Sequence, residues 1–213
     1  MPRIPVPDIA LRTLSRQLGG PSGPLGLVIA RMLNKGNAAS ITAAVQTLQL
    51  RGGETVADIG FGGGFGLGLL LEATRDGGQV HGVEPSADML TRAAKTRGSD
   101  IAAGRLHLHN ARMDSLPFAD GALDGWISVN TIYFVDDLGA ALREMRRVLS
   151  PGARGVIGIA DPRWMSRQAF TKHGFALRPV TDVVAAMEYA GLTTEHHTTG
   201  GPEATFHLLT GTH

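Results

Sequence analysis

The sequence contains no cysteine. This absence excludes disulfide frameworks, thiol nucleophiles and cysteine-ligated zinc or iron–sulfur centres. The sequence also lacks long apolar runs, and the longest of those present is far too short to span a bilayer. Residues 1–18 mix arginine, aspartate and proline, whereas a signal peptide has an uninterrupted apolar stretch. We therefore expect a cytoplasmic protein with no membrane partner.

An excess of charge of one sign is also missing. The chain has 20 Lys and Arg against 19 Asp and Glu, a formal net charge of +1, without a concentrated run of cations. Binding to a phosphate backbone requires clustered cations, so we expect no nucleic-acid partner. The histidines include an alternating pair, His107 and His109, and an adjacent pair, His196 and His197. Neither spacing matches a helical metal-binding pair with a third ligand, so we expect no metal.

The length and composition describe an ordinary globular protein. A chain of 213 residues with 43% hydrophobic and 18% charged residues fits one domain. From residue 55 onwards, short β-branched runs alternate with helical segments, which is typical of parallel βαβ units. We predict a single domain over residues 1–213, with an N-terminal helical cap or lid at 1–50 and an α/β core at 51–213.

The expected elements follow from these patterns. Asn37 is a candidate N-cap for a helix that stops at residues 51–53. Ser86 is a candidate N-cap for a different helix, which follows the second predicted strand. Other helices are predicted at residues 9–18, from about 65 to 72, at 138–149 with a stop at 150–152, and at 180–189, with a short apolar segment at 25–33. Strands are predicted at residues 55–59, 79–83, 105–109, 124–129, 155–160, 194–198 and 204–209.

A dense glycine loop follows the first predicted strand, and it contains Gly60, Phe61, Gly62 and Gly64. Closely spaced glycines let the backbone approach a ligand, as in nucleotide-binding loops. The dinucleotide pattern G-x-G-x-x-G would need a third glycine at position 65, which is phenylalanine. The pattern that fits is an acid, Asp58, followed by G-x-G-x-G. The alternative is that Asp58 caps a turn and the glycines only permit packing.

This loop resembles the first motif of the class I S-adenosylmethionine-dependent methyltransferases. The resemblance implies that Asp58 holds the ammonium group of the cofactor, while N–H groups of the loop face its carboxylate. Glu84 ends the second predicted strand, 24 residues after Gly60, which is the approximate spacing of a ribose-binding acid. The resemblance gives Glu84 the ribose diol and adds Pro85 and Met89 to the cofactor site. The alternative for Glu84 is a solvated acid at a strand end.

Two further stretches resemble the ubiquinone/menaquinone-biosynthesis branch of these enzymes. Residues 110–124 are similar to its D-A-x-x-L-P-F…F-D stretch, and residues 143–154 to its E-x-x-R-V-L-x-P-G-G stretch. The sequence departs from the first pattern, because Asn110 stands where Asp is usual and the spacing to the Leu-Pro-Phe group is longer. The resemblance implies that the adenine ring is held by Asn110, Ala111, Arg112 and Met113, with Asp114 as the competing partner of its amino group.

Candidate catalytic residues follow the later strands. Asn130 and Tyr133 come after the fourth strand, where residues face the crevice at the carboxyl ends, although an aromatic such as Tyr133 is as often part of a core. Asp161 ends the fifth strand and His173 lies in the loop after it, so both are candidate bases. Methyl transfer needs a base only when the acceptor must lose a proton. The sequence therefore leaves open whether oxygen, nitrogen or carbon is methylated.

The resemblance implies a Rossmann-like class I methyltransferase fold, an α/β fold with a seven-stranded, mostly parallel sheet, one antiparallel strand and helices on both faces. It also implies S-adenosylmethionine as cofactor, S-adenosylhomocysteine as product and a small-molecule acceptor, in a monomer or homodimer. Two alternatives remain open, a nicotinamide-dependent oxidoreductase and a non-catalytic S-adenosylmethionine-binding protein.

The acceptor pocket has few possible walls in so short a chain. By elimination, we expect the segment up to Asn37 and the loop at 161–179 to form them. Residues 19–24 then act as a hinge for a lid that closes over the cofactor. Packing of the same segment on the sheet is the alternative. The lid hypothesis gives the segment an apolar inner face made by Leu25, Leu27, Val28 and Met32.

Overall fold

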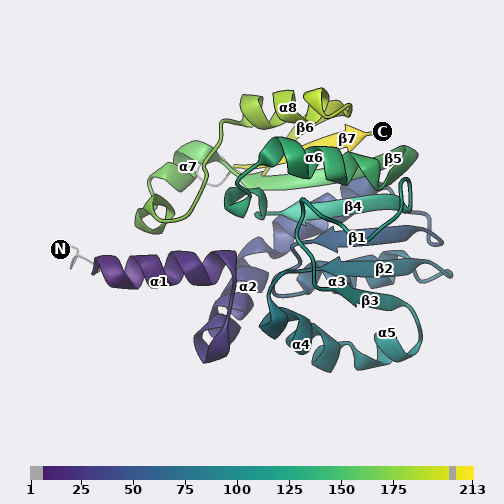
Figure 1. Ribbon diagram of the computed structural model, residues 1–213, viewed down its shortest axis with the longest axis horizontal. Coiled ribbons are helices and arrows are strands. Elements are labelled where there is room, and N and C mark those ends of the chain that lie inside the picture. Colours follow the sequence, from purple (N-terminus) through teal and green to yellow (C-terminus); the bar gives the residue numbers. More distant parts are fainter. Residues whose placement is uncertain (1–6, 202–204) are drawn as a thin grey trace.

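The computed structural model describes residues 7–201 and 205–213, without the side chains of residues 24, 27, 30, 31, 33 and 34. In this part of the chain, seven strands form one sheet in the order β3-β2-β1-β4-β5-β7-β6 (Figure 1). The strands are β1 (Thr55–Ile59), β2 (Gln79–Val83), β3 (Leu106–His109), β4 (Leu123–Val129), β5 (Leu149–Ala160), β6 (Thr193–Thr199) and β7 (Phe206–Thr212).

The strand directions confirm the predicted sheet. The strands β1 to β5 pair in parallel with one another, and β7 pairs antiparallel with both β5 and β6. The predicted last strand began at Ala204, which lies outside the described residues. Parallel strands are covered on both faces, which explains why β1 reads as an apolar run.

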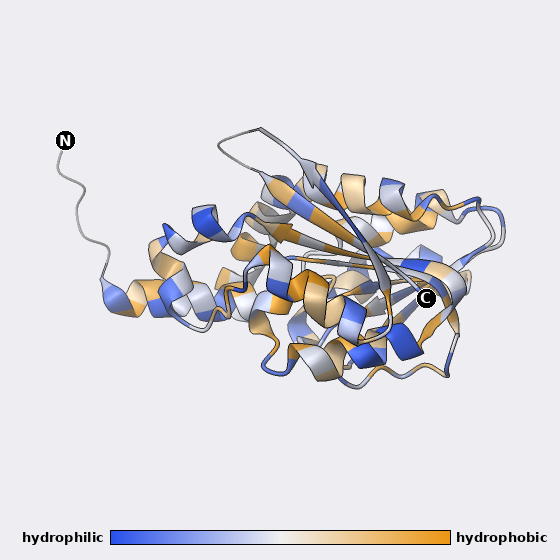
Figure 2. Ribbon diagram, turned by 90° about the horizontal axis from the view of Figure 1, so that it is seen from above, coloured by the Kyte–Doolittle hydropathy of each residue, from blue (hydrophilic) through white to orange (hydrophobic). Residues whose placement is uncertain are grey.

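Helices cover both faces of the sheet. On one face, α2, α3 and α4 contribute Val45, Leu67 and Met89 to the core, and on the other face α6 and α8 contribute Met145 and Met187. Hydrophobic residues concentrate in the strands between these layers (Figure 2). The helices are α1 (Asp8–Gly19), α2 (Gly23–Leu48), α3 (Phe65–Ala73), α4 (Ala87–Thr96), α5 (Gly98–Ala102), α6 (Leu138–Arg147), α7 (Pro162–Ser166) and α8 (Val180–Tyr189), with 3-10 turns η1 (Ile132–Phe134) and η2 (Ala169–Lys172).

The predicted helix start at Asn37 is wrong. Helix α2 runs without a break over 26 residues, and Asn37 lies inside it. Gly36 disfavours a helix by only about 1 kcal/mol relative to alanine, and packing of Ala44, Val45 and Leu48 on the sheet offsets that cost. Because α2 is continuous, the prediction of a separate short apolar segment at residues 25–33 is also wrong.

The predicted helix over 138–149 is too long at its end. Helix α6 ends at Arg147, and β5 begins at Leu149, so residues 150–152 belong to the strand. The predicted loop at 161–179 contains the short helix α7 and the turn η2. No helix in the described ranges is both long enough and apolar enough to cross a membrane.

Candidate functional site

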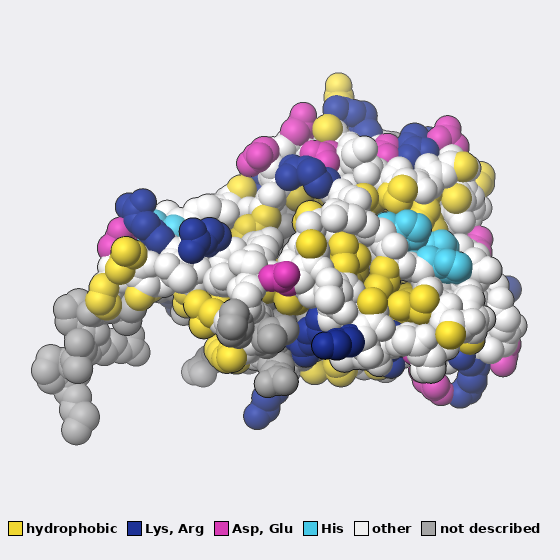
Figure 3. Space-filling view, turned by 60° about the horizontal axis from the view of Figure 1, so that its bottom comes forward, with side chains coloured by type: hydrophobic (Ala, Val, Ile, Leu, Met, Phe, Trp, Pro, Cys, Tyr) yellow, Lys and Arg dark blue, Asp and Glu magenta, His cyan; other side chains and the backbone are white. Residues whose placement is uncertain are grey.

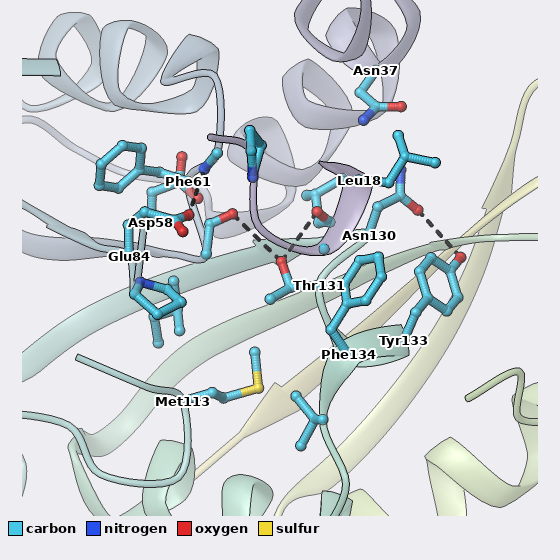
Figure 4. Close-up of a pocket in the computed structure, with 18 of the residues that line it drawn as sticks. Leu18, Asn37, Asp58, Phe61, Glu84, Met113, Asn130, Thr131, Tyr133 and Phe134 are labelled. Atoms are coloured by element: carbon cyan, nitrogen blue, oxygen red, sulfur yellow. Dashed lines mark hydrogen bonds between the residues drawn. The ribbon is translucent and has the colours of Figure 1, made fainter. Parts of the chain in front are cut away.

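A cavity of about 360 Å³ opens where the carboxyl ends of β1 and β4 lie side by side. At this point the strand order reverses, with β2 and β3 on one side and β5 on the other, which is where α/β folds bind ligands. The glycine loop, the residues after β2 to β5, and α1 and α2 form its walls (Figure 4).

The glycine loop takes a conformation that requires its glycines. Gly60, Gly62 and Gly64 have φ values of 78°, 48° and 78°, in the left-handed region that disfavours other residues. A Cβ on Gly60 would also lie 2.4 Å from Cγ2 of Thr131, whereas one on Gly62 would meet nothing within 4 Å. The loop therefore packs on Thr131 at Gly60, whereas the space beside Gly62 is open.

Asp58 lies at the end of β1, below this loop. Its side chain is buried, and a Cβ on Gly66 would lie 2.2 Å from its Oδ2. The glycine in the first turn of α3 therefore leaves room for the carboxylate. Burial, and secondly the charge of Glu84, raises the pKa of Asp58 to about 8. A cation placed in the cavity would relieve both effects.

Glu84 links the end of β2 to the loop. Its Oε2 accepts a hydrogen bond from the N–H of Gly62, and its Oε1 accepts one from the N–H of Ser86, both at 3.0 Å. Burial raises the pKa of Glu84, and these two N–H groups oppose the rise. Two carboxylates thus flank the glycine loop on the same side of the cavity (Figure 4).

A hydrogen-bonded group lies across the cavity from the carboxylates. Asn130 has a left-handed φ of 58°, and its Oδ1 accepts hydrogen bonds from the hydroxyl of Tyr133 at 3.2 Å and from the N–H of Ala160 at 3.3 Å. The N–H of Ala160 also donates to Oη of Tyr133 at 2.9 Å. Burial raises the pKa of Tyr133 above its ordinary value, so the phenol stays protonated.

The rest of the cavity is aromatic and apolar. The rings of Phe134 and Phe175 meet with centroids 4.7 Å apart, and Phe170 lies 5.6 Å from Phe175. Trp164 and Met165 complete this wall. Four of these five residues come from the segment at 161–179, which was expected to form a wall of the acceptor pocket. The sequence did not identify the individual residues, because a phenylalanine in a loop gives no signal of the cavity that distant segments form around it.

The cavity brings most of the predicted site residues together. Gly64, Met89 and Asn110 lie outside its lining. Gly64 caps α3, Met89 is buried in the core, and Asn110 is exposed. The lining contains Asp58, Gly60, Phe61, Gly62, Glu84, Pro85, Ala111, Arg112, Met113, Asn130 and Tyr133.

The two predicted bases also lie outside this lining. Oδ1 of Asp161 accepts the N–H groups of Arg163 and Trp164, both at 2.9 Å, at the start of α7. Its Oδ2 lies 3.2 Å from Nε2 of His207. Chiefly the N–H of Trp164 lowers the pKa of Asp161. His173 faces α1, where its Nε2 lies 3.0 Å from Asp8. Their proposed role as bases therefore has no geometric support in this cavity.

Histidines elsewhere pair with one another. Nδ1 of His81 lies 2.9 Å from Nε2 of His109, and Nε2 of His196 lies 2.9 Å from Nδ1 of His207. No group of three or more His, Asp or Glu side chains within residues 7–201 and 205–213 is arranged to hold a metal ion.

Comparisons with known proteins identify the domain in which the glycine loop lies. The model of the methyltransferase domain matches residues 57–157, which include the end of β1, the glycine loop and β2 to β4. An uncharacterized 37.1 kDa protein in transposon TN4556 of Streptomyces fradiae is 33% identical over 61% of this chain and 39% of its own length. The O-methyltransferase resE of Aspergillus sclerotiorum is 33% identical over 51% of this chain and 40% of its own length. The chain thus spans about two fifths of these relatives.

A solved structure shows the same fold. Geranyl diphosphate C-methyltransferase from Streptomyces coelicolor A3(2), in complex with Mg²⁺, geranyl diphosphate and S-adenosyl-L-homocysteine, is similar with a TM-score of 0.71. The match covers 92% of this chain and 88% of that one at 19% identity. The predicted Rossmann-like class I methyltransferase fold is confirmed.

Proposed function

We propose that this chain, which carries a methyltransferase domain at residues 57–157, is an S-adenosylmethionine-dependent methyltransferase acting on a small molecule. One observation carries the proposal. Two buried carboxylates, Asp58 and Glu84, flank an open glycine loop at the switch point of the sheet. This donor set suits a ligand with an ammonium group at one end and a ribose diol near its centre.

The residues present fit this cofactor. Asp58, neutral in the free site at pH 7, would ionise to bind the ammonium group. Oxygens of Glu84 retain lone pairs for two ribose hydroxyls, since each oxygen accepts one N–H. The buried side chain of Met113 offers an apolar surface to the adenine ring. Asp114, which forms an ion pair with Arg112 at 3.2 Å, remains the competing partner of the amino group.

The chain's contribution to the reaction is alignment and exclusion of water. S-adenosylmethionine supplies a methyl carbon already activated by positive sulfur. Asn130 and Tyr133 hold each other and the end of β5, so they fix the wall that faces the carboxylates. The Tyr133 phenol is neutral and engaged, so we assign it positioning and not proton abstraction.

Replacement of Glu84 by alanine tests the ribose contact. We expect the free energy of S-adenosylhomocysteine binding to weaken by about 1.5–3 kcal/mol, because a charged hydrogen-bonding group is lost. Isothermal titration calorimetry measures the change. Glu72→Ala, which removes an exposed acid on α3, is the matched control and should bind as the wild type does. An unchanged dissociation constant for Glu84→Ala would remove Glu84 from the site.

The narrower assignment to the ubiquinone/menaquinone-biosynthesis branch is supported by residues 110–124 and 143–154. Asn110, which stands where that branch has Asp, departs from its pattern. The named activities of an O-methyltransferase relative and of a C-methyltransferase of the same fold support a small-molecule acceptor. They differ in the atom methylated, so the acceptor atom stays open.

A thermal-shift comparison separates this proposal from the nicotinamide alternative. We expect S-adenosylhomocysteine to raise the melting temperature and NAD to leave it unchanged, because NAD has no ammonium group to pair with Asp58. A shift by NAD alone would favour the oxidoreductase. A screen of metabolite extracts for transfer of a labelled methyl group then separates an enzyme from a non-catalytic binding protein.

A further inference from the structure

The charges of this near-neutral chain are distributed unevenly along the sequence. Residues 1–50 contain five basic residues (Lys and Arg) and one acidic residue, and residues 161–179 contain four basic residues and one acidic residue. Together these two segments have a net charge of +7. The rest of the chain has 11 basic and 17 acidic residues, a net charge of −6. Both segments contribute residues to the cavity walls, and two of their cations, Arg12 and Arg16, line a hollow beside the cavity.

A second hollow lies beside the cavity and carries part of this charge. Its lining includes Arg12, Arg16 and His173, from α1 and the loop after η2, together with one acid, Asp136. The cavity and the hollow share a wall made by Gly19, Tyr133, Phe134 and Phe175. Basic side chains are visible on the projecting end of the molecule formed by α1 (Figure 3).

The two arginines of the hollow differ in their partners. Nε of Arg12 lies 2.7 Å from Oδ2 of Asp8, in an exposed pair. Arg16 is exposed and forms no ion pair with any residue that the structure describes. Asp8 thus holds Arg12, and Asp136 is the acid in the lining of the hollow, so among the described residues Arg16 is the guanidinium group left without a carboxylate partner. Such an arrangement favours an oxyanion, which two guanidinium groups bind through several charge-assisted hydrogen bonds.

The cavity behind the shared wall has the opposite character. Its acceptor side consists of Tyr133, Phe134, Phe170, Phe175 and Met165, none of which carries a charge at pH 7. Aromatic walls of this kind bind planar apolar groups. A molecule that fits both spaces has an apolar ring system at one end and an anionic group at the other.

We propose that the methyl acceptor is a ring-bearing molecule with a carboxylate or phosphate group, which enters through the hollow. Arg12 and Arg16 hold the anionic group at the mouth, and the apolar body lies against the rings of Phe134 and Phe175, which line both spaces. This inference rests on the proposed methyltransferase function, because it takes the aromatic half of the cavity as the acceptor side.

Matched naphthalenes test the proposal without knowledge of the true acceptor. The probes are 2-naphthoate, 2-naphthyl phosphate and the neutral 2-naphthamide, titrated into the full chain with and without saturating S-adenosylhomocysteine. We expect at least one anion to bind about tenfold more tightly than the amide at low ionic strength. This preference should shrink as salt screens the arginines. Whichever anion binds more tightly identifies the group as carboxylate or phosphate.

Variants locate the preference. The preference for the anion over the amide should fall severalfold in Arg16→Ala and vanish in Arg12→Ala/Arg16→Ala. Binding of 2-naphthamide and of S-adenosylhomocysteine should stay as in the wild type. Arg75→Ala is the matched control, because Arg75 also forms an exposed ion pair, with Glu72, but lies outside both spaces.

Three results would overturn the proposal: no measurable binding of any naphthalene, equal binding of the anions and the amide, or an anion preference that survives the double substitution. Failure to bind S-adenosylhomocysteine would instead contradict the proposed function, and it is measured separately in the same titrations.

Discussion

Replacement of Asp58 by asparagine will weaken binding of S-adenosylhomocysteine and also raise the melting temperature of the ligand-free protein at pH 8. Both effects have one cause, a carboxyl group buried where only a bound cation can compensate its charge. Loss of the charged contact should weaken binding by about 1.5–3 kcal/mol. Asparagine keeps the shape of the side chain and cannot ionise, so the substitution isolates the charge.

The sign of the stability change follows from the pKa. The folded chain holds the Asp58 proton more tightly than the unfolded chain, because the pKa is about 8 when folded against 3.8 for the free group. The contribution of this group to the free energy of unfolding therefore falls as pH rises from about 4 to about 8. Wild type and variant should melt alike near pH 4, and the variant should melt higher at pH 8.

Proton release provides an independent measurement. Binding of the ammonium group favours the ionised carboxylate, so at pH 6.5 the wild type should release up to one proton per ligand bound. Calorimetry in two buffers of different ionisation enthalpy detects this release, and Asp58→Asn should abolish it. Glu84→Gln removes the neighbouring charge and should move the pH dependence of stability to lower pH. Equal proton release in wild type and Asp58→Asn would contradict the assignment.

The cofactor side of the site is predictable from the sequence because its determinants are local. The left-handed φ values of Gly60, Gly62 and Gly64 belong to one loop, and Glu84 follows a strand that pairs directly with β1. The parallel direction of the first strands follows from the alternation of strands and helices, whereas the antiparallel strand was implied by the family resemblance. The fold and this half of the site could therefore be inferred from residues close together in the chain.

The acceptor side is set by contacts between distant segments, which a pattern of neighbouring residues does not contain. The hydroxyl of Ser15 donates to the carbonyl of His173, 158 residues away, and Asp161 contacts His207 of the neighbouring strand β7, 46 residues away. Candidate bases chosen by their position after a strand thus proved to have other partners. Helix α2 gives the same lesson, because tertiary packing overrode the capping signal at Asn37.

The predicted inner face of the lid is wrong for the same reason. Leu25, Val28 and Met32 are 48%, 52% and 65% exposed, and the side chain of Leu27 lies outside the described residues. Because α2 is continuous, the residues that reach the cavity from it are Asn37 and Ile41, several turns later. The part of the N-terminal segment that covers the cavity is instead the end of α1 and the turn after it.

This shorter cover is attached on both sides of the cavity. On the cofactor side, the hydroxyl of Ser86 donates to the carbonyl of Pro21 at 2.8 Å, and the N–H of Gly23 donates to Asp88 at 2.7 Å. On the acceptor side, Gly19 packs so closely on Phe134 that an added Cβ would lie 2.6 Å from the ring. The segment thus spans the two halves of the site.

Deletion of residues 1–22 should abolish methyl transfer and leave the protein folded. The deletion keeps α2 whole, including Ala44, Val45 and Leu48, which pack on the sheet. It removes Leu18, Gly19 and Pro21 from the cavity wall, so water enters the site. Circular dichroism checks the fold, calorimetry checks binding of S-adenosylhomocysteine, and transfer of a labelled methyl group to the acceptor found in extracts checks turnover.

Two point variants separate a cover from a purely structural helix. Ser15→Ala removes the contact to His173 and changes one residue of the neighbouring hollow, but leaves every residue that lines the cavity in place, so it should lower turnover while the melting temperature stays close to that of the wild type. Ile9→Ser, at a position that is 76% exposed on the same helix, should change neither. A truncated chain that unfolds would show that the segment is required for folding of the core. A truncated chain that methylates at the full rate would show that the cavity works uncovered, and either result refutes the lid.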